Sequence, residues 1–245
     1  MRPDLDATRA ELAPAGHLRV GLNLANFLLI QPGTGQTSPL GIVPDLARAL
    51  AQELGVSVQF VPYPSPAPLA DAVEHGAWDV AFLADEPARA TTIAFSPAYL
   101  EIQASYLLPA GSTFTHVDEL DRPGHRIASL EGGAYALYLQ RSLKHAQLVL
   151  TSTMEESFRI FVEQGLHALS GLRPRLLSDQ ARLPGSVLLP GSFMAVQQAL
   201  GTSKRHQAAP VYLADFVERA KAKGWVQAAI DTHHVPGVNV APASR

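Results

Sequence analysis

The sequence has no cysteine among its 245 residues, which excludes disulfide bonds and thiol chemistry. It has no run of about 20 apolar residues, the length that spans a bilayer, and no apolar signal-peptide core near its start. Lys and Arg form no cluster and the formal net charge is −3, so we expect no nucleic-acid partner. We also expect no membrane insertion, and a cytoplasmic chain unless an export signal has been removed.

The composition is that of a globular protein, with 47% hydrophobic and 17% charged residues. This length fits either one large domain or two lobes of roughly 100 residues each. A chain of this size can bury a hydrophobic core without disulfides or metals.

Strand and helix patterns alternate through the first 85 residues. Strand patterns occur at 18–23, 56–61 and 78–83, and helical spacing of apolar residues occurs at 42–55 and 65–76. Pro44 suits the first turn of the helix at 42–55, and Gly55 suits its end. The order β-α-β-α-β predicts a parallel sheet covered by helices.

A second, similar pattern follows. Strands are expected at 125–130, 147–150, 166–171 and 186–190, and helices within 131–145, 151–165, 174–181 and 211–224. A capping box is expected at Ser152/Glu155 or at Thr153/Glu156. The fold class is therefore α/β, with two α/β lobes in tandem.

We expect lobe 1 at 17–100 with 199–240, lobe 2 at 104–193, hinges at 99–103 and 194–198, and an N-terminal extension at 1–16. Ligands of open α/β sheets bind beyond the carboxyl ends of the strands. A cleft between two such lobes is the expected site.

An ordered set of segments carries a family resemblance. "LRVGLN", "GIVPDLARALAQELGVSVQFV", "GAWDVAF", Arg89 with "ATTIAFSPAY", and "VERAKAKGWVQAAI" follow one another within about residues 17–231. This order resembles the family 3 solute-binding proteins of bacterial ABC importers, of the polar amino-acid type. The resemblance implies a type II periplasmic-binding-protein fold, whose two lobes are joined by a two-strand hinge and close on a small polar solute. It also implies a periplasmic location, an ABC-transporter permease as partner, and a monomer.

The resemblance implies ligand contacts in both lobes. In lobe 1 the implied residues are Asn23, Asn26 and Phe27 after the first strand, Ala84, Asp85 and Arg89 in the loop "LADEPAR", and Gln197 at the second hinge. In lobe 2 they are Glu131, Gly132, Gly133 and Ala134 of a glycine-rich turn, and Arg173. Where the family has an aspartate for the ligand's α-ammonium, this chain has Leu172.

These residues favour an anionic group on the ligand. A guanidinium such as that of Arg89 grips a carboxylate with two hydrogen bonds, and the helix N-terminus after Gly133 offers further N–H donors. With Leu172 at the aspartate position, one hypothesis is an anion or carboxylate compound that need not be an α-amino acid. The alternative is a zwitterion whose ammonium meets a relocated acid, namely Glu131, Asp85 or Glu101.

Structural roles compete with ligand binding at these positions. Arg89 could pair with Asp85 or Glu86 and tie down its own loop. Asn23 and Asn26 suit turns, Gly132 and Gly133 suit a plain strand-to-helix turn, and Arg173 suits a solvent-exposed helix start. These alternatives stay open at the level of the sequence.

The leading functional interpretation is a binding protein with no catalytic residue, cofactor or metal. The adjacent pair His233–His234 lacks the spacing of a metal site. A ligand sensor inside the cell is one alternative. An enzyme that eliminates water and CO2 from cyclic acids such as prephenate is another, and Glu131 or Glu101 would then be the general acid.

Overall fold

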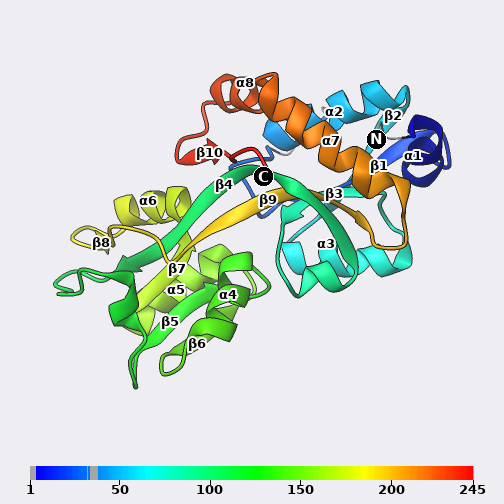
Figure 1. The fold of residues 1–245 in the computed structure, drawn as a ribbon. Coiled ribbons are helices and arrows are strands. Elements are labelled where there is room, and N and C mark those ends of the chain that lie inside the picture. The colour runs from blue at the N-terminus through cyan, green and yellow to red at the C-terminus, as the bar shows by residue number, and fades with distance from the viewer. Residues whose placement is uncertain (1–3, 32, 34–37, 245) are drawn as a thin grey trace. The chain divides into compact units, whose positions relative to one another are not determined.

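The computed structural model of the protein describes residues 4–31, 33 and 38–244. The Gly, Pro and Ser residues of 31–41 predict a turn, and this segment lies partly outside the described residues. The chain divides into two compact units (Figure 1): unit 1 comprises Met1–Glu101 and Gln197–Arg245, and unit 2 comprises Ile102–Val196. Both boundaries fall inside strands that belong to both units, β4 (Ile93–Leu108) and β9 (Met194–Ser203).

The remaining helices and strands of unit 1 are α1 (Leu5–Leu12), β1 (His17–Asn23), α2 (Ile42–Leu54), β2 (Ser57–Tyr63), α3 (Pro66–Asp71), η1 (Ala72–His75), β3 (Val80–Ala84), η2 (Arg89–Thr91), α7 (Ala208–Ala222), α8 (Trp225–Thr232) and β10 (Val238–Val240). Of these elements, β1, α2, β2, α3 and β3 follow one another in the order that the sequence predicts.

The sheet of unit 1 has the strand order β2-β1-β3-β9. β1 is parallel to both β2 and β3, which confirms the predicted parallel core, and β9 joins β3 in the antiparallel direction. Because β1 and β3 are parallel neighbours, their carboxyl ends lie at the same edge of the sheet. Asn23 and Ala84 are the last residues of these two strands.

Helices cover both faces of this sheet: α2, α7 and α8 lie on one side and α3 on the other (Figure 1). The α3 side is closed by a cluster that includes Leu69, Val73, Trp78 and Leu83, all buried. The indole of Trp78 donates to the carbonyl of Leu69 at 2.8 Å, so this tryptophan belongs to the core. Gly55 ends α2 in the left-handed conformation, as its position in the sequence predicts.

Unit 2 has the strand order β4-β7-β5-β6, with β8 paired to β4. Its elements are η3 (Val117–Leu120), β5 (Arg126–Leu130), α4 (Ala134–Ser142), β6 (Gln147–Thr151), α5 (Met154–Glu163), β7 (Ala168–Leu172), α6 (Arg173–Arg182) and β8 (Val187–Leu188). At α5 the second predicted cap is the observed one, because Thr153 Oγ1 accepts the N–H of Glu156 at 3.1 Å.

Alternating residues of unit 2's strands form two cores. Ile127 and Ala168 pack with Leu139 of α4, whereas Ala128 and Leu169 pack with Phe161 of α5 and Leu176 of α6. Successive side chains of a strand point to opposite faces. Helix α4 therefore covers one face of this sheet, and α5 and α6 cover the other.

Three features differ from the sequence-based expectation. Residues 5–12 form a helix that packs on α7, although the sequence indicated only an extension there. The final helix begins at Ala208 rather than 211, and a further helix, α8, follows after Gly224. In the part of the chain that the structure describes, no helix is long and apolar enough to cross a membrane.

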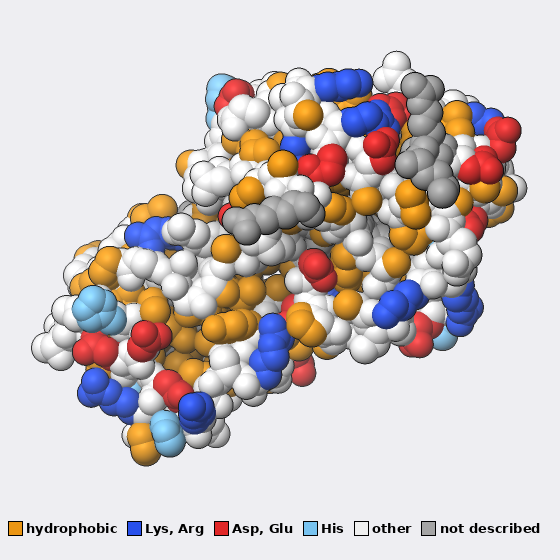
Figure 2. Space-filling view, in the orientation of Figure 1, with side chains coloured by type: hydrophobic (Ala, Val, Ile, Leu, Met, Phe, Trp, Pro, Cys, Tyr) orange, Lys and Arg blue, Asp and Glu red, His pale blue; other side chains and the backbone are white. Residues whose placement is uncertain are grey.

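The charged side chains are mixed on the surface. In Figure 2, Lys and Arg stand beside Asp and Glu over much of the face shown rather than gathering in one region.

Candidate functional site

The polar residues expected to bind a ligand in lobe 1 meet at the carboxyl edge of unit 1's sheet. Asn23 ends β1 and Ala84 ends β3, so the loops that follow these parallel strands start side by side. The loop after β1 carries Asn26 and Phe27, and the loop after β3 carries Asp85 and Arg89. Such an edge is where open α/β sheets bind their ligands.

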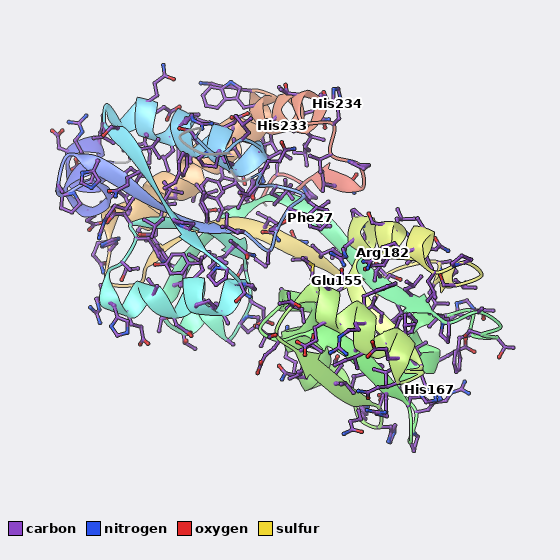
Figure 3. The ribbon with its side chains drawn as sticks, turned by 180° about the vertical axis from the view of Figure 1, so that it is seen from behind. Phe27, Glu155, His167, Arg182, His233 and His234 are labelled. Carbon is purple, nitrogen blue, oxygen red and sulfur yellow. The ribbon has the colours of Figure 1, made fainter. Side chains whose placement is uncertain are left out.

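The loop after β1 is shaped by its two asparagines. Oδ1 of Asn23 accepts the N–H of Ala25 at 3.2 Å, which is the turn-forming role that the sequence left open. The N–H of Asn26 donates to the carbonyl of Asn23 at 3.0 Å. Oδ1 of Asn26 is buried and meets no hydrogen-bond donor among the described residues. Phe27 exposes 42% of its surface, and Figure 3 labels it on this loop.

Arg89 is buried, with only 6% of its surface exposed. Its Nη1 donates to the carbonyl of Ala84 at 3.0 Å, so the guanidinium is held at the end of β3. Burial lowers the pKa of Arg89 to about 10, although the negative charges of Glu86 and Asp71 act in the opposite direction. The guanidinium therefore stays charged at neutral pH.

Glu86, which the sequence analysis considered only as a partner that ties the loop, is buried with 1% exposure. Its Oε2 accepts the N–H of Ala88 at 3.1 Å, and its carbonyl accepts the N–H of Arg89 at 2.9 Å. In the sequence, the three-residue spacing of Glu86 and Arg89 was the signal that these two residues lie close together in the loop. The negative charge of Glu86 favours the protonated form of Arg89.

Asp85 and Gln197, which are 112 positions apart in the sequence, are joined by their backbones, because the N–H of Asp85 donates to the carbonyl of Gln197 at 2.8 Å. Nε2 of Gln197 in turn donates to Oε1 of Glu101 at 2.9 Å. The side chain of Asp85 is exposed. Desolvation by its loop and the nearby charge of Glu86 raise the pKa of Asp85.

In unit 2 the glycine-rich turn links β5 to α4. Gly132 has a positive φ of 69°, and Gly133 is the N-cap of α4, which has no side-chain cap. A Cβ at Gly133 would lie 3.2 Å from the carbonyl oxygen of Leu130, so this approach favours glycine. Glu131 is exposed, and Ala134 is the first residue of α4. The turn thus leads into the N-terminus of α4, where the N-cap residue makes no side-chain capping hydrogen bond.

The side chain of Arg173 forms hydrogen bonds with backbone carbonyls of unit 2. Its Nη1 donates to the carbonyls of Leu189 and Gly191, both at 3.1 Å, and fixes the segment after β8 to the start of α6. The alternative of a purely solvent-exposed arginine is therefore wrong. Leu172 precedes it as the N-cap residue of α6.

An ion-pair network between α5 and α6 was not anticipated. Arg175 pairs with Asp179 at 2.8 Å, and Glu155 accepts hydrogen bonds from both Arg175 and Arg182. Figure 3 shows Glu155 and Arg182 facing one another from the two helices. The hydrogen bonds from Arg182 lower the pKa of Glu155 in spite of some desolvation. The spacing of Asp179 from Arg175, four residues, and from Arg182, three residues, was its local signal.

His233 and His234 lie at the end of α8 (Figure 3). Nε2 of His233 is 2.7 Å from Oδ2 of Asp45, so this histidine links α8 to the first turn of α2. Among the described residues, no group of three or more His, Cys, Asp and Glu side chains is placed to hold a metal ion.

Comparisons with known proteins relate this fold to solute binding. Residues 26–235 match the family described as bacterial extracellular solute-binding proteins, family 3. A comparison with curated protein sequences gave no match.

Solved structures of three similar proteins have the same fold. A putative ABC-transporter binding component from Wolinella succinogenes complexed with lysine is 20% identical, with a TM-score of 0.75 over 89% of this chain and 95% of that one. A substrate-binding protein of an amino acid ABC transporter from Streptococcus pneumoniae bound to L-arginine is 20% identical, with a TM-score of 0.74 over 96% and 99%. An ancestral amino acid-binding protein, a precursor of cyclohexadienyl dehydratase, is 20% identical, with a TM-score of 0.74 over 94% and 99%.

The family match covers well over half of the chain, and its α/β fold agrees with that of solved periplasmic-binding-protein-like structures. The chain therefore belongs to the bacterial extracellular solute-binding proteins, family 3.

Proposed function

We propose that this protein is the substrate-binding component of an ABC importer and that its ligand is a small carboxylate-bearing solute, an amino acid or a related organic acid. The observation that carries the proposal is the buried guanidinium of Arg89, held by the carbonyl of Ala84 at the carboxyl end of β3. Membership of a solute-binding family supports it. The lysine and arginine in two similar structures are consistent with a ligand of this class.

The hydrogen bond to Ala84 ties the loop and also orients the guanidinium. A guanidinium held in place by a backbone carbonyl is pre-organised for a planar anion, because little side-chain freedom is lost when the anion binds. Low exposure strengthens such a contact, since water competes less with the ligand. The loop-tying role and the ligand-binding role of Arg89 are thus compatible.

Asn23, Asn26 and Gln197 would complete the contacts of unit 1. In unit 2, the N-terminus of α4 after Gly133 would donate N–H groups to an anionic part of the solute. The expectation that both lobes close on the solute is part of this proposal.

Replacement of Arg89 by lysine tests the proposal. Arg89→Lys keeps the positive charge and loses the bidentate fork, so affinity for the best-bound compound should fall by about tenfold to hundredfold, the equivalent of a charged hydrogen bond of about 1.5–3 kcal/mol. Isothermal titration with the twenty L-amino acids and a set of organic acids would measure this loss.

Arg205→Lys is the matched control, because Arg205 is an exposed arginine of the same unit. Thermal melts of both variants would establish that they are folded. If a folded Arg89→Lys protein bound the same compounds as tightly as the wild type, Arg89 would not be the carboxylate anchor.

The two candidate general acids do not favour the enzymatic alternative. A general acid of the required kind is buried, whereas Glu131 is exposed. Glu101 accepts a hydrogen bond from the amide of Gln197. We therefore infer a non-catalytic binding protein, which a turnover assay with prephenate would check. Membership of an extracellular solute-binding family leads us to propose that it acts outside the cytoplasm, and fractionation of the native gene product would check this.

A further inference from the structure

The two points at which the chain leaves unit 1 are joined by a side-chain hydrogen bond. Glu101 is the last residue of unit 1 on β4, and Gln197 is the first residue of unit 1 on β9. Nε2 of Gln197 donates to Oε1 of Glu101 at 2.9 Å. Because β4 and β9 are neighbours in the sheet, this bond ties one strand to the other at the edge of unit 1.

The hydrogen-bonded pair lies on the polar face of its two strands. Leu100 and Ile102, on either side of Glu101, are fully buried, and Val196 beside Gln197 is buried as well. Successive side chains of a strand point to opposite faces, so Glu101 and Gln197 point away from these apolar neighbours. Both are half-buried. A hydrogen bond to a carboxylate that is partly shielded from water is stronger than one between neutral groups.

The backbone of Gln197 holds the loop after β3. The paired residues of β3 and β9 extend to Ala84, which lies opposite Gln198. One position further on, the N–H of Asp85 donates to the carbonyl of Gln197 at 2.8 Å. The first residue of the loop is therefore fixed to β9 by the backbone of Gln197, and the side chain of the same residue fixes β9 to β4.

We propose that Gln197 and Glu101 are positioning residues for solute binding, which hold the loop after β3 in place against β9 and β4. This inference rests on the proposed function, because it takes that loop as part of the binding site. Pre-organisation of a binding loop raises affinity, since less conformational freedom is lost when the solute binds. The bond to Glu101 uses one N–H of the side-chain amide, so it is compatible with a contact between Gln197 and the solute.

Exchange of the two side chains tests this role. In Gln197→Glu, two carboxylates face one another and repel. In the double variant Gln197→Glu/Glu101→Gln, an amide again faces a carboxylate, with donor and acceptor exchanged. Wild type, both single variants and the double variant would be titrated calorimetrically with the twenty L-amino acids and a set of organic acids. Thermal melts would establish that each protein is folded at the temperature of the titration.

We expect Gln197→Glu to bind the best-bound compound of the wild type about tenfold more weakly, the equivalent of about 1.4 kcal/mol. Glu101→Gln alone should lose about threefold, because an amide oxygen is a weaker acceptor than a carboxylate. Added to Gln197→Glu, the same Glu101→Gln change should raise the affinity about threefold or more, because it restores the hydrogen bond.

This change of sign distinguishes the hydrogen bond from a general effect of charge. If only the net charge near the solute mattered, Glu101→Gln would alter the affinity in the same direction in both backgrounds. Gln103→Glu is the matched control, because Gln103 is an exposed glutamine two positions after Glu101 in the same strand. It should bind as tightly as the wild type. Equal effects of Glu101→Gln in the two backgrounds, or no effect of Gln197→Glu, would overturn the positioning role.

The outcomes separate this inference from the proposed function. If wild type bound one of these compounds and Arg89→Lys weakened that binding, while the variants at Glu101 and Gln197 bound like the wild type, the proposed function would stand and the positioning role would fall. If wild type bound no compound of either set, both would fall.

Discussion

At the scale of single residues, the hydroxyl of Tyr99 is a polar group without a visible partner. Tyr99 is fully buried in unit 1, and its ring packs edge-on against Phe82 with a centroid distance of 5.7 Å. Among the described residues no group forms a hydrogen bond with the hydroxyl. Burial raises the pKa of Tyr99, so the phenol stays neutral. An unpaired buried hydroxyl reduces the stability of the folded state.

Tyr99→Phe removes this hydroxyl and keeps the ring. We expect the variant to be as stable as the wild type or more stable, by up to about 1 kcal/mol. The reason is that desolvation of the hydroxyl destabilises the folded wild type and no hydrogen bond offsets this cost, whereas the variant has no hydroxyl to desolvate. Urea unfolding followed by circular dichroism would measure the change.

Tyr212→Phe is the control with the opposite sign, because the hydroxyl of Tyr212 donates to Oε2 of Glu53 at 3.1 Å. It should lose about 0.5–1.5 kcal/mol, the usual net value of a hydrogen bond. A loss of more than about 1 kcal/mol in Tyr99→Phe would mean that the hydroxyl of Tyr99 has a hydrogen-bond partner after all.

At the scale of elements, the start of α7 depends on a residue from the other end of the chain. Glu11 of α1 accepts the N–H groups of Gln207, Ala208 and Ala209 at 2.8–3.3 Å. These are N–H groups that an α-helix leaves unpaired at its N-terminus. A carboxylate there also interacts favourably with the helix dipole. Although burial alone would raise the pKa of Glu11, these hydrogen bonds lower it.

Glu11→Gln should lower the free energy of unfolding by about 1 kcal/mol at neutral pH, a typical value for a charged helix cap. The folded-state pKa of Glu11 is depressed, so its contribution is present above the ordinary value of 4.5 and is lost as the pH falls through the folded-state value. The difference between wild type and Glu11→Gln in urea unfolding should therefore shrink in acid.

Asp6→Asn is the control on the same helix, because the side chain of Asp6 is 94% exposed. It should change the stability little at any pH. A Glu11→Gln protein as stable as the wild type at neutral pH would contradict the capping role.

The same element explains a difference between sequence and structure. The sequence predicted a helix from residue 211, whereas α7 begins at Ala208. The N-cap residue Gln207 makes no side-chain capping hydrogen bond. The cap of α7 comes instead from Glu11, which lies 196 residues before Gln207 in the sequence. Periodicity located the body of the helix, and only the tertiary fold sets its first turn.

At the scale of the whole molecule, the chain passes between its two units through β4 and β9. The unit boundaries fall between Glu101 and Ile102 and between Val196 and Gln197. That the segments 99–103 and 194–198 act as hinges stays a prediction, which we base on the family. Closure of two lobes about such strands would trap the solute.

The absence of cysteine makes closure measurable, since engineered thiols can be labelled without interference. Val211 of unit 1 and Val162 of unit 2 expose 54% and 44% of their surfaces. A Val162→Cys/Val211→Cys protein carrying a donor and an acceptor dye should change its energy transfer when the best-bound amino acid is added.

A Leu40→Cys/Val211→Cys protein is the control, because both of these exposed sites belong to unit 1. Its energy transfer should stay constant. Calorimetric binding without any change in the first pair would contradict lobe closure.

The sequence by itself determined the family, the α/β class and most helices and strands of each unit. Helical and strand periodicities are local properties of the chain, and the order of weak motifs is readable without coordinates. The glycine-rich turn at 131–134 and the end of α2 at Gly55 could also be predicted from the sequence, because glycine is the residue that most readily adopts the backbone conformations of turns and helix ends.

Only the tertiary structure decided how the candidate site is built. Asp85 meets the backbone of Gln197, Arg89 reaches back to Ala84, and Arg173 binds carbonyls 16 and 18 residues away. Whether an arginine faces a ligand, a buried acid or a carbonyl depends on the burial and direction of its side chain. Those follow from packing between segments that are distant in sequence, on which local patterns carry no information.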